Sequence, residues 1–100
     1  MPRITEAQIA SIVIDYLHTK NNRQATIHEL VRMIPTVADL SREDMAWSTT
    51  RPNERLWEQR LRNITSHKKS RGNAIHDGLL VSVPYGLALP TEGHSPQRLL

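Results

Sequence analysis

The chain has 100 residues, of which 38% are hydrophobic and 23% are charged, and this composition suits one domain with a modest core. It contains no Cys, which excludes disulfides, thiolate metal ligands and a catalytic Cys. The formal net charge of +3 favours an anionic partner. The first residues lack the apolar core of a signal peptide, and no apolar run reaches the length of a membrane span. We therefore expect a cytoplasmic protein without membrane contact.

Two amphipathic helices are predicted in the first third of the chain. Thr5 and Gln8 have the spacing of a capping box, and apolar residues then recur at helical spacing to about His18. Residues 25–27 suit a short strand. A second capping box at residues 26–29 starts another helix, which is expected to end at Pro35 because proline disfavours a continuing helix.

The segment that follows is polar and acidic at first. Residues 40–45 predict a short helix with Ser41 as its N-cap. We interpret the neighbouring acids Asp39, Glu43 and Asp44 as groups that offset the helix dipole, not as a hydrolytic site. Thr50 is the expected cap of the next helix.

Residues 51–71 carry most of the positive charge. They hold seven Lys/Arg and two Glu, a net charge of +5, whereas the rest of the chain has a net charge of −2. Trp57, Leu61 and Ile64 share one helical face. The pattern predicts a helix over about residues 51–69 with a buried apolar seam and an exposed basic face.

The last third of the chain predicts a β-hairpin and a tail. Residues 79–83 and 87–89 have the composition of strands, and residues 84–86 form a turn between them. We expect the domain to span residues 1–92, with residues 93–100 as a linker or disordered tail.

The predicted fold is mainly α with a small β-hairpin, in the order of a winged helix-turn-helix. In that arrangement the last helix enters the major groove of DNA. Exposed Arg, Asn, Gln and Ser side chains suit base edges and phosphates, so we expect double-stranded DNA as the partner. The five His are scattered, and no nucleophile or phosphate-loop motif occurs. We therefore expect no metal, no cofactor and no enzymatic activity. The candidate DNA-binding residues are Trp47, Arg51, Asn53, Arg55, Gln59, Arg62, Asn63, Ser66, His67, Lys68, Lys69 and Arg71.

Two sets of positions resemble known winged-helix domains. Residues 50–54, 57–60 and 62–68 are similar to modules found beside HNH and other nuclease domains in modification-dependent restriction endonucleases. Positions that resemble the N-terminal domain of Mrr-type restriction endonucleases are residues 40–44, Trp57, Arg60, Leu61, residues 78–80, residues 86–89 and Gly93. The likeness covers about residues 4–93, and this chain inserts residues 70–73 relative to the Mrr pattern.

The resemblance implies a specificity module that binds DNA, and a candidate reader of N6-methyladenine. It also allows a C-terminal nuclease domain in the full-length protein. Trp47 has two open interpretations: an indole that lies over the core, or an aromatic wall against a base or its methyl group. Two alternative functions also stay open, a protein-interaction winged helix and a small transcription regulator.

Overall fold

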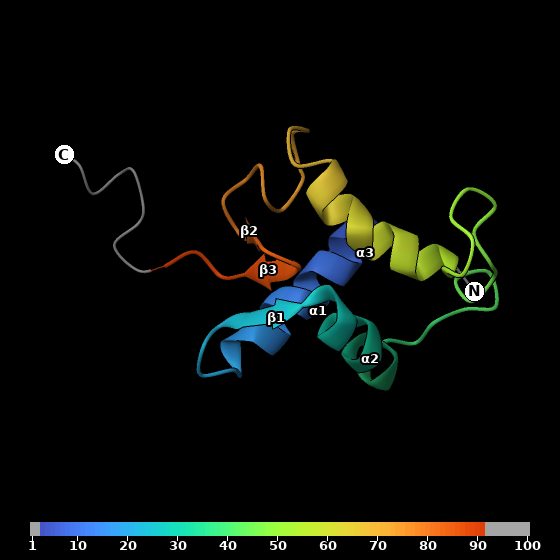
Figure 1. Ribbon diagram of the computed structural model, residues 1–100, viewed down its shortest axis with the longest axis horizontal. Coiled ribbons are helices and arrows are strands. Elements are labelled where there is room, and N and C mark those ends of the chain that lie inside the picture. The colour runs from blue at the N-terminus through green and yellow to red at the C-terminus, as the bar shows by residue number, and fades with distance from the viewer. Residues whose placement is uncertain (1–2, 92–100) are drawn as a thin grey trace.

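The computed structural model describes residues 3–91, which form three helices and a small antiparallel sheet (Figure 1). In chain order the elements are α1 (Glu6–His18), β1 (Gln24–Thr26), α2 (Ile27–Val37), α3 (Leu56–Ser66), β2 (Val81–Val83) and β3 (Gly86–Ala88). The sheet has the order β1-β3-β2. The expected mainly helical architecture with a hairpin is therefore confirmed. The expected tail, residues 93–100, lies outside the described residues.

The start and end of α1 agree with the prediction. The Thr5 hydroxyl accepts a hydrogen bond from the Gln8 N–H at 3.0 Å, and the Gln8 side chain accepts one from the Thr5 N–H at 2.8 Å. The helix ends at His18. Both partners of the capping box are close in sequence, which is why the pattern alone located this helix.

The second helix starts where predicted, with Thr26 as its N-cap, but the Glu29 half of the capping box is absent and the helix ends later than predicted. The Thr26 hydroxyl accepts from the Glu29 N–H at 3.0 Å, but the Glu29 carboxylate accepts hydrogen bonds from Tyr16 and Lys20. The expected end at Pro35 is wrong, because α2 continues to Val37. Proline removes one helical donor, yet Ala38 N–H still donates to the Ile34 carbonyl at 2.9 Å. Ile34 is fully buried, so packing holds this last turn against the core.

The apolar seam of α3 is buried as predicted. Trp57, Leu61 and Ile64 lie in one core cluster with residues from the other helices and from the hairpin. Their main companions are Ile9, Val13, Leu17, Leu30, Ile34, Leu80 and Leu87. No helix among residues 3–91 combines the length and the apolar character that crossing a bilayer requires.

The predicted short helix at residues 40–45 is wrong. Ser41 and Asp44 do exchange hydrogen bonds, with the Ser41 hydroxyl accepting at 3.1 Å and the Asp44 carboxylate accepting at 2.9 Å. However, only one helical turn forms. The carbonyls that would continue it turn toward α3 instead, because Leu56 N–H donates to Ala46 O at 2.9 Å and Trp57 N–H donates to Asp44 O at 3.1 Å.

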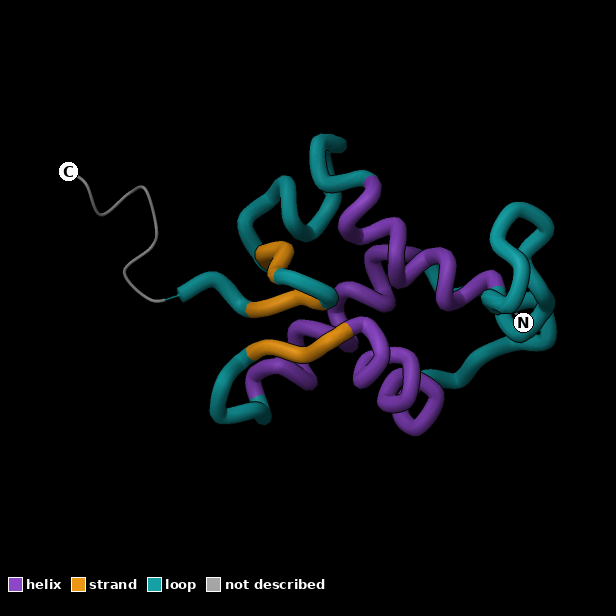
Figure 2. Tube along the Cα trace, viewed as in Figure 1, coloured by secondary structure: helices purple, strands orange, loops and turns teal. Residues whose placement is uncertain are grey.

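The basic helix is shorter than predicted, since α3 begins at Leu56 and ends at Ser66. Residues 51–54 form a turn in which Glu54 N–H donates to the Arg51 carbonyl at 3.2 Å. Asn53 has a φ of 72°, which a right-handed helix does not accommodate. Thr50 is therefore not a cap of this helix. Figure 2 shows loops at both ends of α3, and the one before it spans residues 38–55.

Candidate nucleic-acid interface

A groove of about 280 Å³ lies between α3 and the β2–β3 hairpin. Two arginines, four hydroxyl groups and the tip of the hairpin open into it. Its lining consists of Ile27, Arg51, Arg62, Thr65, Ser66, Ser82, Val83, Tyr85 and Gly86. Guanidinium and hydroxyl donors together are the groups that bind phosphate oxygens in proteins. The structure thus brings three of the predicted residues, Arg51, Arg62 and Ser66, to one site.

Arg62 is not a free cation. Its Nε forms an ion pair with the carboxylate of Glu54, and the Glu54 side chain is only 14% exposed. The other carboxylate oxygen, Oε1, is buried and has no hydrogen-bond partner. An anion that approaches Arg62 therefore meets a guanidinium whose charge is already partly neutralised.

The side-chain amide of Gln59 forms hydrogen bonds with the loop that precedes α3. Its Oε1 accepts from the Ser48 hydroxyl at 2.9 Å, and its Nε2 donates to the Thr50 hydroxyl at 3.3 Å. The Ser48 hydroxyl also accepts the backbone N–H groups of Thr50 and Arg51, at 3.2 and 3.0 Å. These bonds hold the loop across the N-terminal half of α3. The side-chain amide of Gln59, one of the predicted DNA-binding residues, is therefore engaged within the domain.

Trp47 lies in the same loop and is 58% exposed, so the interpretation that it lies over the core is wrong. The guanidinium of Arg55 stacks on the indole, and the two residues form an antiparallel backbone bridge. Asn53 is exposed at the tip of this loop. One face of the Trp47 ring is thus already occupied by a cation.

Asn63 and His67 face away from the groove toward the start of α1. Asn63 lines a hollow with Arg3, Thr5, Glu6 and other residues. His67 Nδ1 lies 2.7 Å from Glu6 Oε1, which ties the end of α3 to the first turn of α1. The structure therefore separates these two predicted residues from the three that line the groove.

Three predicted cations follow the end of α3. Lys68, Lys69 and Arg71 are exposed, and none of them forms an ion pair with another residue of the described part of the chain. By contrast, Arg60 lies against the buried carboxylate of Asp44, with 3.6 Å between Nη1 and Oδ1. The available positive charge is thus displaced toward the C-terminal end of the helix.

The sequence prediction missed Thr65, Ser82 and Tyr85 in the groove. Tyr85 is 87% exposed at the tip of the hairpin. The Pro-Tyr-Gly string at residues 84–86 did signal a turn, but nothing local showed that this turn lies beside α3. The turn is held at the start of α2, where Ile27 N–H donates to the Tyr85 carbonyl, and Ile27 and Tyr85 line the groove together with Arg62 of α3.

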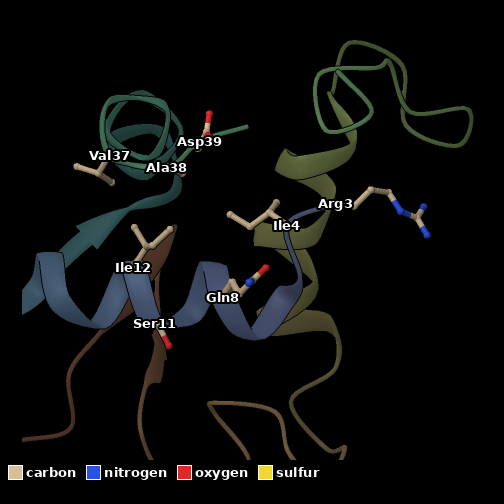
Figure 3. A pocket seen from close by; sticks show the side chains of 8 residues that line it. All are labelled: Arg3, Ile4, Gln8, Ser11, Ile12, Val37, Ala38 and Asp39. Carbon is tan, nitrogen blue, oxygen red and sulfur yellow. The ribbon is translucent and has the colours of Figure 1, made fainter. Parts of the chain in front are cut away.

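A second hollow lies between α1 and the end of α2, on a different part of the surface. Figure 3 shows Ile4, Ile12 and Val37 around it, with Arg3 and Asp39 nearby. Val37 is 65% exposed. The lining of this hollow is mixed, with Ile4, Ile12, Val37 and Ala38 beside the polar residues Arg3, Gln8, Ser11 and Asp39.

Comparison with known proteins adds no assignment. No protein-family model matches the chain, and neither the curated proteins nor the solved structures contain a significant match. Among residues 3–91, no three His, Asp or Glu side chains are grouped so that they could hold a metal ion. The groove, the loop of residues 47–55 and the cations after α3 are therefore the features from which a function is inferred.

Proposed function

We propose that this domain is a winged helix-turn-helix that binds double-stranded DNA with α3 and the β2–β3 hairpin. The order of the elements and the sheet order β1-β3-β2 support a winged helix in which this hairpin is the wing. The observation that carries the proposal is the groove between α3 and the hairpin, lined by Arg51, Arg62 and four hydroxyl groups. A phosphate oxygen in this groove would find both charge and hydrogen-bond donors.

The main binding energy would come from phosphates. Lys68, Lys69 and Arg71 extend the positive surface beyond the groove, and each phosphate that they neutralise releases counterions. The N–H groups of Leu56 and Trp57 are already bonded to loop carbonyls. Phosphates would therefore be held by side chains and not by the start of α3, where many helices bind anions.

Base contacts would come from two places. The tip of the loop presents Asn53, and the indole of Trp47 is exposed at the start of the same loop. The loop covers Gln59, so the N-terminal half of α3 would not reach a base edge without moving the loop. In this arrangement the loop supplies base contacts, whereas in many helix-turn-helix domains the exposed face of the recognition helix supplies them.

Recognition of a modified base is the finer part of the proposal. The exposed indole of Trp47 offers one ring face to a partner, since Arg55 covers the other. A methyl group on N6 of adenine projects into the major groove, and burying it against an indole contributes about 1 kcal/mol. That is too little to carry binding, but enough to choose between sites of equal charge. In this reading the domain is the specificity module of a modification-dependent restriction endonuclease.

Salt dependence of duplex binding tests the proposal. Affinity of the parent domain should fall steeply with salt. Changing Arg51, Arg55, Arg62 or Lys69 to Ala should flatten the logarithmic salt slope by roughly one unit for each phosphate contact that is lost. Arg32→Ala is the matched control, because Arg32 is an exposed cation on α2 that does not line the groove. A quadruple variant that binds duplex DNA like the parent would contradict the proposal.

A protein-interaction domain is the second candidate, and the exposed Val37 favours it. The hollow around Ile4, Ile12 and Val37 suits an apolar side chain from a partner peptide. Such binding would change little with salt and would be lost in Val37→Asp, while the quadruple arginine and lysine variant would bind normally. The two candidates thus give opposite results with the same pair of proteins.

A further inference from the structure

Tyr85 places a large aromatic side chain at an exposed turn position, where it gains nothing from the core. Its φ is +64°, in the left-handed region that Gly and Asn tolerate better than an aromatic residue. Its side chain is 87% exposed, so burial does not compensate for the strain. The turn between Val83 and Gly86 requires a positive φ at its second position, which explains the backbone but not the choice of an aromatic residue there. The exposed ring is therefore a candidate for a functional contact.

The backbone that carries Tyr85 is firmly held. A two-residue turn links β2 to β3, because Val83 pairs with Gly86. Ile27 N–H donates to the Tyr85 carbonyl at 2.7 Å, which ties the tip to the start of α2. A Cβ on Gly86 would lie 2.0 Å from the Ala25 carbonyl oxygen, so the hairpin is pressed against β1. The ring therefore leaves a fixed backbone, and ordering it on a ligand costs little entropy.

The ring also stands beside the charges of the groove, since Tyr85 lines it together with Arg51 and Arg62. We propose that Tyr85 lies against the deoxyribose next to the phosphate held in this groove, with its hydroxyl toward a phosphate oxygen. The apolar ring matches the apolar face of the sugar, and the hydroxyl matches the charged oxygens. This inference rests on the proposed DNA-binding function and adds a contact that carries no charge.

Tyr85→Asn tests this contact, because the substitution removes the ring without removing a charge or disturbing the turn. Asn accepts the left-handed conformation, so the melting temperature should stay unchanged or rise. Affinity for duplex DNA should fall by about tenfold, the size of one aromatic contact with a nucleotide. The salt slope should stay that of the parent, because no cation is lost. Tyr85→Phe keeps the ring and should recover most of the affinity.

The outcomes distinguish the two levels of the proposal. If the parent binds duplex DNA with a steep salt slope and Tyr85→Asn binds equally well, the Tyr85 contact is wrong and the DNA-binding function stands. If the parent shows no salt-dependent binding, the proposed function itself fails. A loss confined to single-stranded DNA would indicate base stacking, and an equal loss in Tyr85→Asn and Tyr85→Phe would indicate the hydroxyl alone; either result overturns the sugar contact.

Discussion

The guanidinium of Arg55 lies over the indole of Trp47, with its central carbon 3.6 Å from the ring centroid. Arg55 Nη1 also donates to the Met45 carbonyl at 2.8 Å, and its backbone bridges to that of Trp47. Cations are attracted to the electron-rich face of an indole. The stack therefore closes the base of the loop of residues 47–55 and fixes how the loop tip stands beside α3.

Trp47→Ala tests whether the indole reads a methyl group. We expect the variant to lose any preference for a methylated duplex, while its affinity for the unmethylated duplex stays within a few-fold of the parent. The measurement compares both duplexes of one sequence at a single salt concentration, since the methyl contributes only about 1 kcal/mol. Trp47→Phe is the control that keeps an aromatic surface under Arg55. Equal losses on both duplexes would show that Trp47 only supports the loop.

Glu54→Gln should increase affinity for DNA. The substitution removes the negative charge that pairs with Arg62 and leaves the half-exposed guanidinium available to a phosphate. The logarithmic salt slope should steepen by up to about one unit. Asp15→Asn, an exposed acid on α1, is the control for net charge. Weaker binding by Glu54→Gln would mean that Glu54 positions Arg62 for its contact.

Leu61→Ala should destabilise the domain by about 2–5 kcal/mol, the range for emptying a fully buried leucine site. Leu61 lies in the core cluster and is completely buried. Chemical denaturation followed by Trp fluorescence measures the loss. Lys69→Ala, at an exposed position, should change stability by less than about 0.5 kcal/mol. A small effect of Leu61→Ala would contradict the observed packing of α3.

The stability of the domain should decrease in acid partly through Glu29. Hydrogen bonds from Lys20 and from Tyr16 lower the pKa of Glu29 below its ordinary value of 4.5. The folded state therefore binds a proton less readily than the unfolded chain. The stabilisation from the ionised Glu29 carboxylate is fully present above its unfolded-state pKa. It is lost as the pH falls through the lowered pKa of the folded state. Urea unfolding at several acidic pH values should show a shallower loss for Glu29→Gln than for the parent.

Patterns with local partners predicted much of the fold. The Thr5 capping box and the periodic seam of Trp57, Leu61 and Ile64 located α1 and oriented α3, because each depends on residues within a few positions. The start of α3 could not be predicted in this way. Ser48 binds the N–H groups of residues 50 and 51 and so draws them into a turn, which overrides the helical preference of that segment.

The sequence predicted the positive charge of the candidate site, but it did not predict which of those side chains pair with acidic residues. The excess of Lys/Arg in residues 51–71 is visible in the sequence, whereas the partners of those cations depend on tertiary structure. His67 meets Glu6 from 61 positions earlier in the chain. Arg62 meets Glu54 across the turn that replaces the expected first turn of the helix. Helical spacing alone placed these residues on a face but could not show which ones were already engaged.

The first amides of α3 are bonded to main-chain carbonyls of Asp44 and Ala46, so no side chain at the loop tip is needed to start the helix. Thr49 and Pro52 are exposed, and Asn53 occupies a conformation that glycine also accepts. Randomising Thr49 and Pro52 while keeping Asn or Gly at position 53 should thus yield a library of folded proteins with different loop tips. Under the proposed function, exchange of the loop tip would change the DNA target without loss of the fold, because the start of α3 is bonded to main-chain carbonyls.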